Sequence, residues 1–539
     1  MRTIIKIFKF TLICIIYLSL WDNKIYGQPI TFEFSPISKL EIQGKEFSGI
    51  IDYYKEKYVL IGYNCKSSPK LCYYSKKLEL NQVYSLNFSN QYNLKCSPIA
   101  SKSYIINDKL IVLTECHNPA IKKYQIHAWH LNEKGAILKG PIEIIRSNTS
   151  IKSESPDYLL DISQDKNYIV VIDKTKMTFG QELAGVQYKF FDSELELSLH
   201  RIINIPVDNL SLTLDKAITY NKKTAVLAFK SSKIPKTTNA NIAVKSVSLD
   251  LVRINLEEAS FHYLPINTSD NPFVNQVKLV VSRDQKSLFV VSSCGSGPTS
   301  GVVSLHIQKF NNNDSVPLTS HIALITPNFR KIAETNNRKF IDTNKPKRVL
   351  KGVMDLDLQF FEINKDQFMA TASIKRNNID AISDANKFGG VNYDKSITTY
   401  YCQGATVVNG TWSQGPHSVF DHYIDQAIQN KGSMPIAYGT AFLPHPKFSL
   451  CLLSELPENS KLDEKHDLKT QITEKNWRKS RSHLLHLDTI GRKNHWQIFS
   501  NPNDLGYIAP SSIFYESPNR FLFLGEDVKG RLRLIRGTY

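Results

Sequence analysis

The sequence lacks closely spaced cysteines, because its eight cysteines are scattered over 539 residues. Structural zinc sites usually draw ligands from pairs separated by about two to four residues, so we predict no metal site. Beyond its first residues, the chain also lacks apolar segments near the ~18 residues of a membrane-spanning helix. With 42% apolar and 22% charged residues, its composition excludes a disordered, collagenous or coiled-coil chain.

Signatures of catalysis are also missing. The stretch Ser292–Gly301 has neither the Gly-x-Ser-x-Gly spacing of a nucleophile elbow nor the Gly-Lys-Ser/Thr of a phosphate loop, and we predict a flexible inter-strand loop there. The turns at Ser163 and Ser282 resemble the start of the aspartate box of sialidase-type propellers, but the glycine and tryptophan of that motif are absent. We therefore assign no catalytic residue and no cofactor.

Positive charge is abundant but diluted. The sequence has 67 lysines and arginines against 50 acidic residues, a formal net charge of +17. A nucleic-acid-binding protein concentrates such charge on one face, whereas lysine is spread here along the whole chain, so we predict no nucleic-acid partner. The densest basic stretch, residues 328–351, either contacts an acidic glycan or a membrane surface or is a long exposed loop.

The N-terminus has the layout of a signal peptide. Basic residues precede the apolar run Phe10–Trp21, which is too short to span a bilayer. We expect cleavage after Gly27, so that residues 1–27 form the signal peptide and residues 28–539 the mature protein. The mature protein is predicted to be secreted or periplasmic, in the cell envelope, without a transmembrane segment.

Seven cysteines remain after export, in a compartment where thiols can pair. Two of them flank a short turn, so we predict a disulfide between Cys65 and Cys72 first, and one between Cys96 and Cys116 next. Seven is an odd number and spacing does not fix connectivity. The full pairing therefore stays open for Cys65, Cys72, Cys96, Cys116, Cys294, Cys402 and Cys451.

Strand periodicity dominates the sequence, in short runs of Ile, Val, Tyr, Phe and Leu broken by Asn, Asp, Lys and Gly. Two kinds of turn alternate. One is a tight polar turn before a strand that is apolar on both faces, which we expect to be buried on both; the other joins half-exposed strands. The turns fall at Asn107, Asn132, Gln164, Asp192, Asn221, Asn255, Asp284 and Asn311, which gives a four-stranded repeat of about 57 to 62 residues.

Four antiparallel strands per repeat form the blade of a β-propeller, whose sheets pack face to face around a central channel. We predict an all-β protein with a single β-propeller of seven or eight four-stranded blades. The segments 30–34 and 531–539 are predicted as the first and last strands, which meet and close the ring. A long inter-strand insertion is predicted at about 377–482, and within it one short helix at Ser418–Asn430 with Ser418 as its N-cap.

A set of sequence features extends over the N-terminal segment and most of the mature chain. It comprises the signal peptide, the Ser-x-Asp hairpins, two strands that end in aspartate, Val186–Asp192 and Ser482–Asp488, and the closing strand Gly530–Gly537. In these features the chain resembles uncharacterised exported β-propeller-like proteins of Bacteroidetes. The resemblance implies the fold and an envelope location, and it assigns no activity to particular residues.

Histidine and carboxylate cluster at one place in the sequence. His417 and His422 flank the start of the predicted helix, with Asp421 and Asp425 nearby. This set suits a metal or acid/base site, and a capped surface helix explains the same residues.

Other candidate residues have plain structural explanations. The pairs His127/His130 and His483/His486 are three residues apart, which places the members of each pair on opposite faces of a strand. Asp355 and Asp357 share a strand face, which suits either acid/base work on a glycan or a solvated strand.

These observations predict a monomeric exported scaffold, rather than an enzyme, that binds a protein or glycan partner through loops at one end of the ring. The alternative is a propeller-fold hydrolase of glycans or peptides whose acid/base residues come from different blades and converge in the channel. A third possibility is a basic binder of membrane surfaces or polyanions, whose affinity falls with added salt.

Overall fold

The computed structural model describes most of the chain from residue 30 onward. The signal-peptide segment and much of the basic stretch lie outside the described residues. The described residues are 30–36, 47–62, 69–88, 99–118, 120–150, 157–173, 183–206, 210–233, 247–264, 266, 273–295, 302–312, 314, 316–327, 329, 356–381, 396–430, 440–445, 449–455, 481–487, 493–497, 507–517, 519–527 and 529–539.

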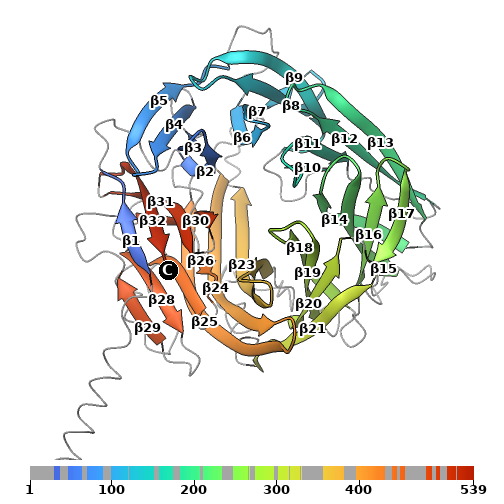
Figure 1. Ribbon diagram of the computed structural model, residues 1–539, viewed down its shortest axis with the longest axis vertical. Helices are drawn as coiled ribbons and strands as arrows, with labels where there is room; N and C mark the ends of the chain where they lie inside the picture. Colours follow the sequence, from blue (N-terminus) through green and yellow to red (C-terminus); the bar gives the residue numbers. More distant parts are fainter. Residues whose placement is uncertain are drawn as a thin grey trace, which may run out of the picture.

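The described chain forms eight four-stranded antiparallel sheets arranged around a common axis (Figure 1). The predicted all-β propeller is confirmed, with eight blades. In blades 1 to 7 the first strand in the sequence is nearest the axis and the last is outermost. Blades 1 to 4 are β2 (Phe47–Tyr54), β3 (Lys57–Gly62), β4 (Lys70–Ser75), β5 (Leu80–Ser85); β6 (Ile99–Ile106), β7 (Lys109–Asn118), β8 (Lys123–Leu131), β9 (Ile137–Ser147); β10 (Tyr158–Ile162), β11 (Ile169–Asp173), β12 (Leu183–Phe191), β13 (Leu197–Pro206); and β14 (Leu210–Thr219), β15 (Thr224–Lys233), β16 (Val247–Asn255), β17 (Ser260–Leu264).

The second half of the ring follows the same order. Only blade 8 differs, because its outermost strand is the first strand of the chain. Blades 5 to 8 are β18 (Phe273–Val281), β19 (Ser287–Gly295), β20 (Val302–Asn311), β21 (Pro317–Leu324); β22 (Leu356–Glu362), β23 (Gln367–Ala381), β24 (Ser396–Thr411), β25 (Gly415–Asn430); β26 (Thr440–Leu443), β27 (Ser449–Glu455), β28 (Arg481–Leu487), β29 (Lys493–Gln497); and β30 (Tyr507–Ser517), β31 (Arg520–Glu526), β32 (Leu532–Thr538), β1 (Thr31–Phe34).

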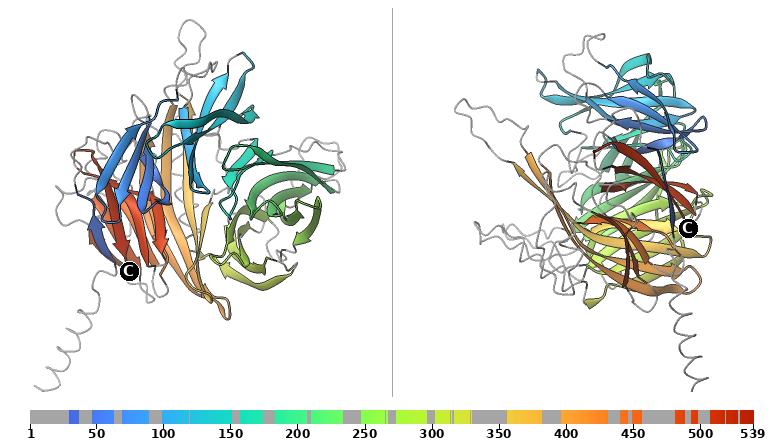
Figure 2. Two further views of the ribbon diagram at one scale, coloured as in Figure 1. Left: turned by 45° about the horizontal axis from the view of Figure 1, so that its top comes forward. Right: turned by 90° about the vertical axis from the view of Figure 1, so that its left-hand side faces the viewer.

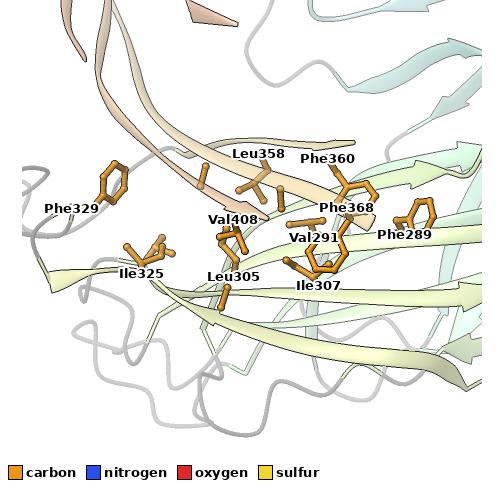
Figure 3. Close-up of a cluster of buried hydrophobic side chains, with 14 of the residues drawn as sticks. Phe289, Val291, Leu305, Ile307, Ile325, Phe329, Leu358, Phe360, Phe368 and Val408 are labelled. Atoms are coloured by element: carbon orange, nitrogen blue, oxygen red, sulfur yellow. The ribbon is translucent and has the colours of Figure 1, made fainter. Parts of the chain in front are cut away.

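Each interface between neighbouring blades holds one cluster of buried apolar side chains. Strand β11 shows how one strand serves two clusters: Ile169 and Val171 pack toward blade 2, whereas Val170 and Ile172 pack toward blade 4. Alternate side chains of a strand point to opposite faces, so a strand apolar on both faces is buried on both, as predicted. Figure 3 shows the cluster between blades 5 and 6.

The predicted turns are confirmed, and they lie at one end of the ring. Asp192 is representative, since its Oδ1 accepts hydrogen bonds from the backbone N–H groups of Glu194 (2.9 Å) and Glu196 (3.0 Å). Leu195 within that turn adopts a φ of 60°. Such side-chain bonds to the local backbone explain why Asn, Asp and Ser recur at this point of each repeat.

The two ends of the ring differ in the length of their connections. At one end, the short-turn end, the connections join first to second and third to fourth strands and span two to six residues between strand bounds. At the other, the long-connection end, they reach 25 residues between β27 and β28 and 31 between β21 and β22. Strands β23 and β24 are themselves extended and reach beyond the other blades at this end (Figure 2).

The ring closes where the first and last strands pair, as predicted. Strand β1 is antiparallel to β32, with Thr31 opposite Thr538 and Phe34 opposite Ile535. Beyond β1, the N–H of Ser35 donates to the carbonyl oxygen of Leu534 (2.8 Å).

A buried ionic network joins the closing strands to blade 1. Arg536 of β32 binds Glu33 of β1 (Nη1 to Oε2, 2.7 Å) and lies 3.7 Å from Glu516 of β30 (Nε to Oε2). Its Nη2 also donates to the Tyr58 hydroxyl of β3 (3.1 Å) and to the carbonyl oxygen of Lys76 (2.5 Å). Tyr58 in turn donates to Glu516 (2.7 Å), so one guanidinium connects four strands and a turn.

The predicted helix at Ser418–Asn430 is wrong, because these residues belong to β25. The strand pairs with β24 along its length, with Val419 opposite Val408 and Phe420 opposite Val407. Phe420 is buried and Val419 is exposed, which is the two-residue alternation of a strand. The pairing of this segment with β24 outweighs its weak local preference for a helix.

The region predicted as an insertion, about 377–482, contains strands of two blades. It includes β24 to β27 and the ends of β23 and β28. The additional length therefore falls in the connections that follow β23, β25 and β27 and in the extended strands themselves.

The predicted disulfides involve residues outside the described part of the chain. Cys72 is wholly buried in β4 and Cys116 is buried in β7, but Cys65 and Cys96 are not described. Ile99, three residues after Cys96, is opposite Glu115 in the register of β6 and β7. Cys72, which the structure describes, forms no disulfide, so the predicted Cys65–Cys72 pairing is wrong. The pairing of Cys96 with Cys116 stays a prediction, which this register favours.

Candidate functional site: the central channel

The innermost strand of each blade lies nearest the axis of the ring (Figure 1), and the space around this axis that the exposed side chains of these strands face is here called the central channel. Both faces of a blade are covered by its neighbours. A side chain that is exposed on an innermost strand, away from the strand ends, therefore faces the channel. Such side chains form the wall of the candidate site.

At the short-turn end, hairpins from non-adjacent blades contact each other. Lys166 in the first hairpin of blade 3 forms an ion pair with Asp52 of β2 (2.6 Å), past blade 2. Gln285 in the first hairpin of blade 5 donates from Nε2 to the carbonyl oxygen of Gln164 (3.4 Å), past blade 4. These contacts narrow the channel mouth at this end.

Blades 5, 6 and 8 add further contacts at this mouth. The backbone N–H of Arg283 donates to Glu362 Oε2 (3.2 Å). Phe361 of β22 packs edge-on against Tyr515 of β30, with ring centroids 5.8 Å apart, past blade 7. Burial raises the pKa of Tyr515 above its ordinary range, and the positive charge of Arg283 opposes this shift. The short-turn mouth is thus crossed by polar and aromatic contacts.

Farther in, the channel wall carries charged side chains. Lys102 of β6, Asp161 of β10, Lys216 of β14 and Lys278 of β18 are exposed residues on innermost strands. The Nζ of Lys102 lies 3.4 Å from the carbonyl oxygen of Leu160. The surrounding protein desolvates this ammonium group and lowers the pKa of Lys102, although nearby Asp161 acts in the opposite direction.

Among the described carboxylates of the innermost strands, several lie beside a lysine. Asp52 pairs with Lys166 (2.6 Å) and Asp215 with Lys230 (3.5 Å). Each of these two carboxylates is engaged by the ammonium group of its lysine partner. The hydrolase alternative therefore gains no support from these residues.

The channel lysines and the contacts across the mouth were not predicted from the sequence. Lys216 and Lys278 each stand three residues before the last residue of their strand. The shared position of the two lysines becomes visible when the repeats are aligned on their turns. No comparable signal links Asp52 to Lys166, which is 114 residues away.

The histidine pairs on strands are structural. His127 is buried and its neighbour His130 is half-exposed on β8, as expected for opposite faces of a strand. His483 and His486 are both buried in β28. In the described part of the chain, histidine, cysteine, aspartate and glutamate form no group of three that could hold a metal ion.

Burial makes His127 a source of pH-dependent stability. Desolvation lowers the pKa of His127 below 6.5, and Glu143 on the neighbouring strand partly opposes it. The unfolded state then binds more protons, so the free energy of unfolding falls as pH drops through 6.5, by at most about 1.4 kcal/mol per pH unit for one histidine. We expect His127→Gln to flatten this dependence in urea titrations between about pH 5 and 7. An unchanged slope would contradict the assignment.

The cluster of histidine and aspartate predicted around the helix lies on β25 instead. His417 is exposed, and Asp421 accepts a hydrogen bond from the Thr326 hydroxyl. The side chains of His422 and Asp425 lie outside the described residues, so a site formed by all four stays a prediction.

The stretch Ser292–Gly301 is partly a buried strand. The prediction of a loop is wrong for Ser292 to Gly295, which end β19 with all four residues buried between β18 and β20; the rest lies outside the described residues. Burial raises the pKa of the Cys294 thiol to about 11. Its reactivity at neutral pH is therefore low.

The predicted aspartate pair is only partly described. Asp357 is half-buried on β22 opposite Ser373, whereas Asp355 lies outside the described residues. No helix in the described ranges has the length and apolar character needed to cross a membrane.

Comparisons with known proteins give resemblances of overall fold. No family model and no curated protein matches the chain. Similar solved structures include the Dos1 propeller, with a TM-score of 0.38 and 10% identity over 94% of this chain and 95% of that one. The WD40 domain of SCAP from fission yeast gives 0.35 and 11% over 95% and 99%, and the β-propeller domain of the Trilobed protease from Pyrococcus furiosus gives 0.30 and 11% over 71% and 96%. Similarities this weak carry no argument about function.

Proposed function

We propose that the protein is an exported propeller scaffold that binds a protein or glycan partner through the long-connection end of the ring. The observation that carries this proposal is the asymmetry between the two ends. Short turns of two to six residues occupy one end, and connections of up to 31 residues leave from the other. Binding residues of rigid scaffolds commonly lie on such long connections.

The contacts at the short-turn mouth support the same orientation. Lys166 is paired there with Asp52, and Gln285 donates to the carbonyl oxygen of Gln164. These polar groups are therefore engaged within the protein. The region of the chain with the most additional length, about 377–482, contributes connections to the opposite end.

The test is to remove one long connection without disturbing its blade. Glu455 and Arg481 are opposite each other in the register of β27 and β28, so a turn of about four residues can replace residues 456–480. We expect this variant to unfold at the same urea concentration as the wild type and to lose or weaken binding to partners captured from envelope extracts or glycan arrays. As a control, Lys77→Gln/Lys134→Gln changes only exposed short-turn residues.

Two outcomes would contradict the proposal. One is wild-type protein that captures nothing while it hydrolyses a glycan or peptide library. The other is binding that survives shortening at the long-connection end and disappears in the short-turn control.

A further inference from the structure

We propose that the channel wall formed by blades 4 to 6 binds an anionic sugar chain, with Lys216 and Lys278 as the side chains that contact its acidic groups. This inference rests on the proposed function and specifies the partner. It also fixes the direction of access, from the long-connection end.

The two lysines occupy equivalent positions on adjacent blades. Lys216 is opposite Ala228 and Lys278 is opposite Val291, in each case three register pairs before the end of the strand at the short-turn hairpin. Their strands, β14 and β18, are in contact. Both residues are exposed although both faces of their sheets are covered, so they project two positive charges into the channel at one height.

The acidic residue next to Lys216 is paired with another lysine, and amide side chains lie on the neighbouring innermost strands. Asp215, a bulge residue next to Lys216, is paired with Lys230 on the adjacent strand (3.5 Å). On blade 6, Gln359 of β22 is opposite Thr371, and this pair also lies three register pairs before the end of its strand. Gln359 is half-exposed, and so are Asn275 and Gln276 on β18.

These groups suit a sugar chain better than a peptide. Lysine supplies a charged donor for carboxylate or sulfate. The amides of Gln359, Asn275 and Gln276 both donate and accept, which matches sugar hydroxyls that also do both. An acidic peptide offers these amides one backbone N–H and one C=O per residue, whereas each sugar offers several hydroxyls.

The direction of access follows from the contacts across the short-turn mouth. The ion pair between Lys166 and Asp52 and the contact between Gln285 and Gln164 lie on the short-turn side of the lysines. A chain several sugars long therefore reaches Lys216 and Lys278 from the long-connection end.

The experiment is calorimetric titration of the full mature chain with four probes. Oligogalacturonate carries carboxylates, and sulfated dextran oligosaccharides carry sulfates. Unmodified dextran is the neutral control, and short polyglutamate is the acidic peptide. The variants are Lys216→Gln/Lys278→Gln and the charge-matched control Lys77→Gln/Lys134→Gln, whose lysines are exposed on short turns.

We expect at least one anionic sugar to bind, and the channel variant to weaken it at least about tenfold through loss of two charge-assisted contacts. The control should change affinity less than about twofold, because exposed charges outside the site are screened. Whichever sugar binds more tightly shows whether carboxylate or sulfate is the preferred group.

Several results would overturn the inference: no binding of either anionic sugar, equal binding of dextran, equal or tighter binding of polyglutamate, or equal losses in both variants. Failure of the inference is distinguishable from failure of the proposed function. In the first case partners captured from extracts still depend on residues 456–480 but not on the channel lysines, whereas in the second neither change affects binding.

Discussion

Replacing Arg536 with methionine is expected to lower the free energy of unfolding by about 3 to 5 kcal/mol, because it removes one partner of a buried ion pair. The Arg536 side chain is 10% exposed and that of Glu516 is 18% exposed. Without the guanidinium, the Glu516 carboxylate keeps its hydrogen bond from Tyr58 and its exposed neighbour Arg520 at 3.8 Å, but it loses its buried positive partner. The carbonyl oxygen of Lys76 also loses its donor.

The matched control for this change is Glu33→Gln. The Glu33 side chain is 57% exposed, although its bond to Arg536 is only 2.7 Å long. Exposed ion pairs contribute little, so we expect a loss below about 1 kcal/mol. Urea unfolding followed by tryptophan fluorescence measures both variants. Equal effects of the two substitutions would show that the network does not hold the closing strands to blade 1.

Replacing Trp129 with alanine is expected to cost about 3 to 5 kcal/mol through the cavity it leaves. Trp129 is wholly buried in the cluster between blades 1 and 2, where its ring lies 5.3 Å from that of Phe88. Its Nε1 donates to the Thr114 hydroxyl at 2.7 Å. Alanine removes both the packing and this hydrogen bond.

Trp129→Phe separates the two contributions. Phenylalanine keeps most of the apolar volume and removes the donor to Thr114, so we expect a smaller loss of about 1 to 3 kcal/mol. Urea midpoints of the two variants are the measurement. A phenylalanine variant as unstable as the alanine variant would contradict the assignment of most of the energy to packing.

The blade architecture was predictable from sequence because its causes are local. An aspartate such as Asp192 binds the backbone of its own turn, whatever the rest of the chain does. Strands such as β11 are apolar at consecutive positions, which signals burial on both faces. Repetition of these two signals at a fixed spacing then gives the number of strands per blade.

The failures have non-local causes. The segment Ser418–Asn430 has apolar residues that fit one face of a helix, and its pairing with β24 decided otherwise. The segment Ser292–Gly295 has the small residues typical of a loop, but it lies between two strands of blade 5 and is buried.

The candidate site was the least predictable part. Lys216 and Lys278 are two of many lysines, and only the closed ring shows that they face a shared channel. The contact of Asp52 with Lys166 joins residues 114 apart, and that of Glu33 with Arg536 joins residues 503 apart. Single-sequence patterns contain no information about such pairs.

The most direct test of the closed ring is a cross-link between its first and last strands. Thr31 and Thr538 are register partners, and the Thr31 hydroxyl donates to the carbonyl oxygen of residue 538 at 3.3 Å. Antiparallel partners have Cα atoms about 4.5 to 5.5 Å apart, which a disulfide spans. In the variant Thr31→Cys/Thr538→Cys, peptide mapping after mild oxidation should show an intramolecular disulfide between positions 31 and 538 in most molecules. Thiols that stay reduced at both positions, or cross-links only between molecules, would contradict ring closure by β1 and β32.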